Sequence, residues 1–280
     1  MRKEKSEHVK DAGSPQWNTP LTLLFPAIGK RTISLVGNLG AMLIFFSLAF
    51  VNIFRRKQFR EIVNQVYYIG ATSSLIVMLV GLFTGMVLGL QLFYTLVKFG
   101  SVGALGSAVS LSLIREMGPV LTAIMITARA GSGMAAEIGI LRISEQIDAL
   151  YTMRIDPVRY LISPRIAASI ISFPLLTAFF DLIGIIGGYI TGVLLLGTSG
   201  GTYFYRVQSS LNMVDVRGGF IKALVFAVIV SCVCCFQGYF CHMRTDGYGS
   251  KSVGLATISA VVLSCVMILI ADYIVTSFLM

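Results

Sequence analysis

Two adjacent charged residues, Arg115 and Glu116, interrupt an otherwise apolar segment and are followed closely by Gly118 and Pro119. Inside a lipid bilayer an ionisable side chain costs roughly 2.5 to 3.5 kcal/mol on insertion scales, so it faces a cavity or a partner. Adjacent helical residues point about 100° apart, so these two side chains cannot satisfy each other. Another helix, a second protomer, water or a polar ligand must do so, and Pro119 predicts a kink beside them.

The sequence lacks the motifs of the common catalytic classes. It has no GxxxxGK[ST] loop for ATP hydrolysis, no GxSxG nucleophile motif, no HExxH pair and no cluster of histidines with carboxylates. We therefore expect no catalytic residue, no metal site and no cofactor held by this chain. If ATP drives the protein, a separate subunit hydrolyses it.

The five cysteines are an odd number, lie mostly in one apolar run and lack the paired CxxC motifs or nearby histidines of a metal site. This pattern favours a packing role over a disulfide framework or a metal site. The residues concerned are Cys232, Cys234, Cys235, Cys241 and Cys265.

Composition indicates an integral membrane protein. Of the 280 residues, 56% are hydrophobic and only 12% are charged, and the mean hydropathy is +0.83; a soluble domain has about 25% charged residues. The net charge of +9 would suit nucleic acid in a soluble protein. In a membrane protein it reflects the excess of Lys and Arg in cytoplasmic loops, so we expect no nucleic-acid partner.

Six apolar stretches are long enough to cross a bilayer as helices, and none has the alternating pattern of a barrel strand. They lie near residues 33–54, 67–97, 105–128, 165–196, 218–241 and 255–279. The first has basic residues at both ends, which favours a helix in the cytoplasmic interface or a re-entrant one. We therefore expect an all-α membrane protein with an N-terminal region at 1–60 and a domain of five transmembrane helices at 61–280.

The basic residues also predict the orientation. Residues 1–60 carry ten Lys and Arg, and the loops at 129–165 and 242–254 carry five and two. The loops at 98–106 and 197–217 carry only Lys98, Arg206 and Arg217. The positive-inside rule then places the N-terminus in the cytoplasm and the C-terminus outside.

Small and polar residues recur within the predicted spans. Glycines at 81, 85 and 89 and at 184, 188 and 192 form two GxxxG ridges, which predict close helix contacts within the fold or between protomers. Gln91 and Tyr94 offer polar groups at the outer end of the first span. Asp181 and Asp272 are read first as structural hydrogen-bonding groups, with a proton relay as the alternative.

The loop after the second span predicts an amphipathic helix over about 133–150. Ile140, Ile143, Ile147 and Leu150 fall on one helical face, and charged residues lie off it. Such a helix is either a solvated surface element or a docking element for a cytoplasmic partner.

Three long segments resemble the MlaE-type permeases, the membrane subunits of ABC systems that move phospholipid together with MCE-domain proteins. They read GLFTGMVLGLQ at 81–91, REMGPVLTAIMITARAGSGMAAEIGILRISEQIDAL at 115–150 and DPVRYLISPRIAASIISFPLL at 156–176. The resemblance runs from about Glu61 to Met280, and the cysteine-rich stretch at 232–254 departs from it. It implies a homodimer with an N-terminal interfacial helix and five membrane spans in each copy.

The resemblance also implies partners and sites. The partners are a MlaF-like ATPase that binds ATP and Mg, a MlaD-like MCE subunit and, as an optional component, a MlaB-like STAS-domain subunit, all at the cell inner membrane. A phospholipid cavity at the dimer interface would involve Gln91, Tyr94, Phe99, Arg115 and Glu116. A cytoplasmic coupling helix would dock on the ATPase through Glu137, Arg142, Glu145, Gln146 and Asp148.

The functional hypothesis is therefore a permease subunit of an ABC transporter that moves phospholipids between membranes. The alternative is a secondary transporter or channel that uses an ion gradient, with Glu116, Asp181 and Asp272 as its path. A membrane-embedded lipid enzyme is a third class, for which the sequence offers no nucleophile and base at recognisable spacing.

Overall fold

The computed structural model describes residues 59–243, 247 and 249–279, together with 37, 40 and 47. The chain divides into two units, 1–43 and 44–280, and the helices below belong to the second. The interfacial or re-entrant helix predicted at 33–54 lies almost entirely outside the described residues, as does most of the predicted N-terminal region at 1–60.

Five described helical spans are long and apolar enough to cross a bilayer, which confirms the predicted all-α membrane fold. They are Phe59–Lys98, Val102–Ile143, Val158–Leu195, Met213–Tyr239 and Ser250–Leu279. We number them as the first to the fifth span. A helix satisfies its own backbone hydrogen bonds, so an apolar run of this length is stable in lipid.

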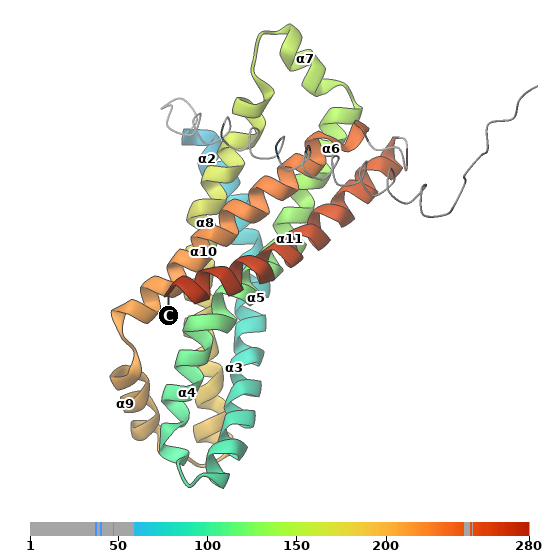
Figure 1. Ribbon diagram of the computed structural model, residues 1–280. Helices are drawn as coiled ribbons and strands as arrows, with labels where there is room; N and C mark the ends of the chain where they lie inside the picture. The colour runs from blue at the N-terminus through green and yellow to red at the C-terminus, as the bar shows by residue number, and fades with distance from the viewer. Residues whose placement is uncertain are drawn as a thin grey trace, which may run out of the picture. The chain divides into compact units, whose positions relative to one another are not determined.

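The spans are built from α-helices joined by short π-helical or 3₁₀ turns (Figure 1). The α-helices are α2 (Phe59–Val66), α3 (Thr72–Lys98), α4 (Leu105–Ser112), α5 (Gly118–Ile126), α6 (Ser132–Ile143), α7 (Gln146–Thr152), α8 (Ser163–Tyr189), α9 (Gly200–Ser210), α10 (Met213–Tyr239) and α11 (Ser250–Leu279). The π-helical turns are Tyr67–Ala71, Leu113–Met117, Thr127–Gly131, Val158–Ile162 and Ile190–Leu195, and the 3₁₀ turns are Val102–Ala104 and Cys241–Met243.

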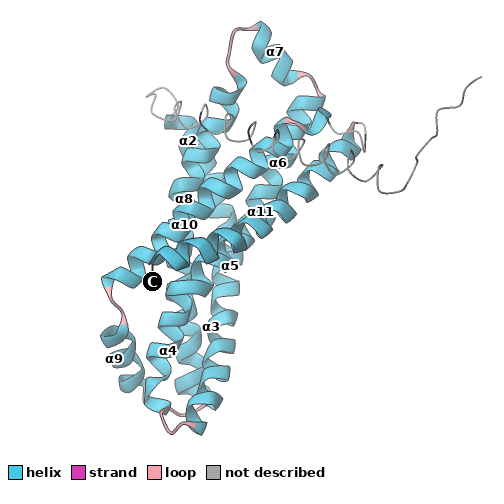
Figure 2. Cartoon of the chain, in the orientation of Figure 1, coloured by secondary structure: helices cyan, strands magenta, loops and turns pink. Residues whose placement is uncertain are grey.

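The first three spans run between two ends of this unit, whereas α10 and α11 reach only one of these ends and stop near the middle in this view (Figure 2). One end, called the α7 end, carries α7 and the loop from α10 to α11. The opposite end, called the α9 end, carries α9 and the turn from α3 to α4. The loops predicted to be cytoplasmic therefore share the α7 end, and the two predicted to be external share the α9 end.

The closest helix pair is α3 against α8, and glycines make it possible. A methyl group built on Gly85 would lie 1.8 Å from the carbonyl oxygen of Gly184, and one on Gly89 would lie 3.2 Å from the Cα of Gly188. Small residues let helix backbones approach in lipid, where no hydrophobic force drives helices together. The prediction that the GxxxG ridges make tight contacts is confirmed, and the contact lies within one chain.

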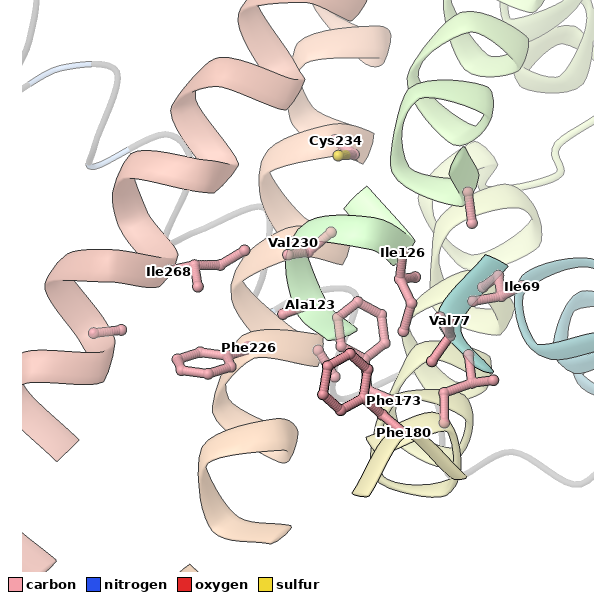
Figure 3. Close-up of a cluster of buried hydrophobic side chains, with 14 of the residues drawn as sticks. Ile69, Val77, Ala123, Ile126, Phe173, Phe180, Phe226, Val230, Cys234 and Ile268 are labelled. Carbon is pink, nitrogen blue, oxygen red and sulfur yellow. The ribbon is translucent and has the colours of Figure 1, made fainter. Parts of the chain in front are cut away.

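The main buried core lies where the first three spans meet α10 and α11 (Figure 3). Phe173 and Phe180 of α8 pack there with Ile126 of α5 and Phe226 of α10, and all four are at most 1% exposed. This packing holds the second and fourth spans beside each other.

The prediction of a single amphipathic helix over 133–150 is wrong. Helix α6 continues the second span and buries Met134, Ala135 and Ile138. The chain then breaks at Glu145, whose φ of 58° is left-handed, before the short helix α7 begins at Gln146. The predicted apolar stripe is therefore divided, with Ile147 fully buried and Ile140 58% exposed.

We predict that Gly85→Ala separates α3 from α8 and lowers the free energy of unfolding by about 1 to 3 kcal/mol, because the added methyl group meets backbone. Thermal unfolding of the purified protein, followed with a thiol-reactive dye, measures the change. Gly254→Ala is the matched control, because no atom lies within 4 Å of the methyl group it adds. Equal unfolding midpoints for the two variants would contradict the assigned contact.

Candidate functional site

Lys222 of α10 lies at the centre of a group of charged side chains between the second, fourth and fifth spans. Its side chain is only 3% exposed. The ammonium nitrogen Nζ donates to Glu116 Oε2 at 2.8 Å, and it lies 3.0 Å from Asp272 Oδ1 as an ion pair without hydrogen-bond geometry. A buried ammonium group is tolerated only among acceptors that replace its water. Lys222 therefore ties the three spans together.

A backbone carbonyl completes the surroundings of Lys222. The carbonyl oxygen of Arg115 accepts a hydrogen bond from Nζ at 2.8 Å. In a regular helix this carbonyl would accept from the N–H four residues later, but that residue is Pro119, which has none. The structure has the π-helical turn Leu113–Met117 directly before Gly118 and Pro119, and the kink predicted there stays a prediction. Lys222 uses the carbonyl that Pro119 leaves without a backbone donor.

Arg115 itself pairs with Asp215 in the first turn of α10. Its Nε and Nη2 atoms both lie 2.8 Å from Asp215 Oδ1. The other carboxylate oxygen, Oδ2, accepts from the backbone N–H of Asn212 at 3.2 Å, and the Asn212 side chain caps the same helix. This capping box fixes the Asp215 rotamer. The Arg115 side chain nevertheless stays 43% exposed, so part of its guanidinium can bind something else.

We call Arg115, Glu116, Asp215, Lys222 and Asp272 the charged cluster. It borders a pocket of about 370 Å³, whose other walls come from α10 and α11. Those walls are formed by Val214, Gly218, Gly219, Thr276 and Leu279. The pocket thus combines charged groups of both signs with small and apolar surface.

The sequence left open whether another helix, a second protomer, water or a ligand satisfies Arg115 and Glu116, and the structure shows that residues of α10 pair with both. Of the five residues of the charged cluster, Arg115, Glu116 and Asp272 were identified from sequence, whereas Lys222 and Asp215 were missed. Lys222 could have been found by the rule that singled out Arg115, because it is a lone cation in the apolar segment GFIKALVF. The position of Asp215 depends on where α10 begins, which hydropathy does not define.

The other predicted cavity residues lie apart from the charged cluster. Gln91, Tyr94 and Phe99 are exposed at the end of α3 and just beyond it. Within the described part of the chain, no hydrogen bond or ion pair joins them to Arg115 or Glu116. Their role in a cavity stays a prediction.

The intramembrane carboxylates differ in their surroundings. Asp272 is ion-paired to Lys222, as is Glu116, which fits a structural role for both. Asp181 instead has no hydrogen-bond or ion-pair partner among the described residues, contrary to the expected structural hydrogen bond. A proton relay along Glu116, Asp181 and Asp272 would have to include Glu116 and Asp272, which are both ion-paired to the buried Lys222.

A second polar network lies at the α7 end. Arg142 Nη1 donates to Asp148 Oδ1 at 2.7 Å, its Nε donates to His242 Nδ1 at 3.1 Å, and the guanidinium lies 5.6 Å from the centre of the Tyr239 ring. Burial and the Arg142 charge lower the pKa of His242. The network joins α7 to the loop after α10.

The predicted docking residues divide into two kinds. Glu145, Gln146 and Asp148 are exposed. Glu137 is half-buried and accepts a hydrogen bond at 2.8 Å from Arg165 of α8. Arg142 and Glu137 therefore hold the loop within the chain, whereas the other three are exposed, with Asp148 also paired to Arg142; their role in docking stays a prediction.

The cysteines lie among packed helices. Cys232, Cys234, Cys235 and Cys241 are buried, Cys265 is half-buried, and none of the five forms a disulfide with another described residue. Cys234 Sγ lies 3.7 Å from Ser264 Oγ on α11, and Cys241 Sγ donates to the Gly139 carbonyl at 3.6 Å. These contacts fit the packing role expected for them.

We predict that Lys222→Met destabilises the protein by about 3 to 5 kcal/mol, because it leaves Glu116 and Asp272 without their cation. Thermal unfolding of the purified variant measures the loss. The triple variant that adds Glu116→Gln and Asp272→Asn removes the unpaired charges and should recover much of it. A single variant as stable as the wild type would show that the ion pairs do not hold the spans.

The chain is similar to known permeases over nearly its whole length. A family model described as Permease MlaE matches residues 62–278. A probable ABC transporter permease protein of Rickettsia bellii is 41% identical over 251 residues, covering 89% of this chain and 95% of that protein. The intermembrane phospholipid transport system permease protein MlaE of Haemophilus influenzae is 40% identical over 255 residues, covering 90% and 95% of the two chains.

A more distant relative comes from a chloroplast. The Arabidopsis thaliana protein trigalactosyldiacylglycerol 1 is 34% identical over 219 residues, covering 78% of this chain and 61% of that protein. The family model covers all five described spans apart from a few terminal residues, including the charged cluster and the loop at the α7 end. The chain therefore belongs to the MlaE permease family.

Proposed function

We propose that the protein is the membrane subunit of an ABC transporter and that it moves phospholipids between membranes. The family match and the permeases named among its relatives support the transporter class. The observation that carries the substrate class is the charged cluster, which borders a pocket within apolar spans. A phospholipid has the matching parts, because a charged headgroup and apolar acyl chains meet in one molecule.

Arg115 is the residue that would bind the headgroup. Asp215 holds its Nε and Nη2, and 43% of its side chain is still exposed beside the pocket. A guanidinium group donates several hydrogen bonds in one plane and suits phosphate oxygens. Lys222 is fully engaged by acceptors, so its proposed role is to hold Glu116 and the spans in place.

A homodimer would complete the lipid cavity. The exposed side of α3 carries large apolar residues and ends in Gln91, Tyr94 and Phe99. We place these three residues at the cavity entrance between two copies, where acyl chains would pass. Apolar surface of this kind faces lipid or another helix in a membrane protein.

A separate ATPase subunit of the MlaF type would bind ATP and Mg and supply the energy. Glu145, Gln146 and Asp148 would dock on it. Helix α6, which leads into their loop, belongs to the same helical span as Arg115 and Glu116. Movement of the loop by the ATPase would therefore be transmitted along the second span to the lipid pocket.

The orientation follows from the loop charges. Arg154 and Arg159 add to the positive charge of the α7 end, whereas the α9 end carries few cations. We therefore assign the α7 end and the N-terminus to the cytoplasm, and the α9 end and the C-terminus to the periplasmic side of the inner membrane. A MlaD-like MCE subunit would meet the α9 end, and a MlaB-like STAS subunit would bind through the ATPase.

We predict that Arg115→Met weakens phospholipid retention about tenfold, because it removes charge-assisted hydrogen bonds to the headgroup. Quantitative lipid mass spectrometry of protein purified in mild detergent gives the number of phospholipids per chain. Arg206→Met removes an exposed cation from α9 and serves as the control. If both variants retain lipid like the wild type, Arg115 does not bind the headgroup.

We also predict that Glu145→Lys combined with Asp148→Lys abolishes assembly with the ATPase or its stimulated turnover, because both side chains are exposed on the proposed docking loop. Co-purification and ATP hydrolysis by the complex report the effect. Glu61→Lys is a matched charge reversal on α2, outside that loop. Normal assembly and turnover in the double variant would exclude this docking surface.

A further inference from the structure

A second pocket lies beside the charged cluster, between the second span, α8 and α10. Its volume is about 260 Å³. Its lining is almost wholly apolar and consists of Ile114, Thr177, Ala178, Asp181, Leu182, Ile185, Leu211, Val216, Gly219 and Phe220. Asp181 is its one ionisable residue, and we call this cavity the Asp181 pocket.

The carboxyl group of Asp181 has no partner in the described part of the chain. Its Oδ1 atom is buried and makes no hydrogen bond, and no ion pair involves the residue. The two cations of the adjacent charged cluster are already held, Arg115 by Asp215 and Lys222 by Glu116 and Asp272. Asp181 as a whole is half-buried, and its other carboxylate oxygen is not among the buried atoms without a partner. A carboxylate in apolar surroundings without a cation or hydrogen-bond donor is costly, so this group lacks an interaction that a ligand could supply.

The backbone around Asp181 is shaped to keep the carboxyl group in place. A methyl group built on Gly118 would lie 1.9 Å from Asp181 Oδ1. Only glycine therefore allows the helix after the π-helical turn to approach this side chain so closely.

The pocket therefore offers one carboxyl group without a partner among the described residues, within an almost wholly apolar lining. A ligand that fits must bring hydrogen-bond donors with positive charge at one end and an apolar chain at the other. From this chemistry we propose that the Asp181 pocket binds the primary ammonium group of an amphiphile, with Asp181 as its counter-ion and the apolar lining around its hydrocarbon chain.

This site is distinct from the headgroup site proposed at Arg115, although Gly219 lines both pockets. The inference goes beyond the proposed function and does not depend on it. Lipid retention by Arg115 and amine binding by Asp181 are measured on different variants, so either proposal can fail alone.

The test uses the full-length protein in lipid nanodiscs and two probes of equal chain length, n-octylamine and n-octanol. Thermal unfolding, followed with a thiol-reactive dye, gives an apparent affinity from the rise in midpoint with probe concentration. The wild type should be stabilised by octylamine more than by octanol. Asp181→Asn should weaken the octylamine affinity at least ~30-fold, the effect of removing one partner of a buried charge pair.

Two further variants keep the test decisive. Ala178→Leu fills part of the pocket while keeping the carboxyl group, and it should also remove the octylamine response. Asp156→Asn removes an exposed loop carboxylate and should respond like the wild type. The proposal is overturned if octylamine and octanol stabilise the wild type equally, or if Asp181→Asn or Ala178→Leu retains the full response to octylamine.

Discussion

A lysine buried between membrane-spanning helices has to be surrounded by acceptors, and Lys222 finds them on the second and fifth spans. Glu116 and Asp272 supply negative charge, and the Arg115 carbonyl supplies the acceptor that Pro119 leaves without a backbone donor. One side chain thus links the π-helical turn of the second span to α10 and α11. The position of Arg115 beside its pocket follows from that link.

The second span connects the two regions on which the proposed function depends. It contains the charged pair and the π-helical turn, and it continues through α6 to the loop at the α7 end. Packing of α6 on α10 and α11 and the Glu137 to Arg165 pair hold that end in place. The second span is held at the α7 end and has a π-helical turn beside the pocket. Movement of its loop can therefore bend the span at this turn.

Much of the fold could be predicted from sequence, because helix length, loop charge and glycine spacing are local signals. Five spans and close contacts at the glycine ridges follow from them, but the pairing of α3 with α8 does not. The break at Glu145 could not, because burial of Ile147 against other helices decides it rather than periodicity. Sequence identified Arg115 and Glu116 as residues that need partners, but choosing Lys222 and Asp215 requires the relative rotation of two helices.

The central claim is that a phospholipid headgroup lies beside the charged cluster and is displaced when the ATPase closes. A photoreactive amino acid at Val214, which lines the pocket, tests this in the assembled transporter. Val262, exposed on α11, is the reference position. We expect crosslinking of phospholipid at Val214 to fall when nucleotide is trapped, with no change at Val262. Crosslinking that responds equally at both positions, or at neither, would contradict the account.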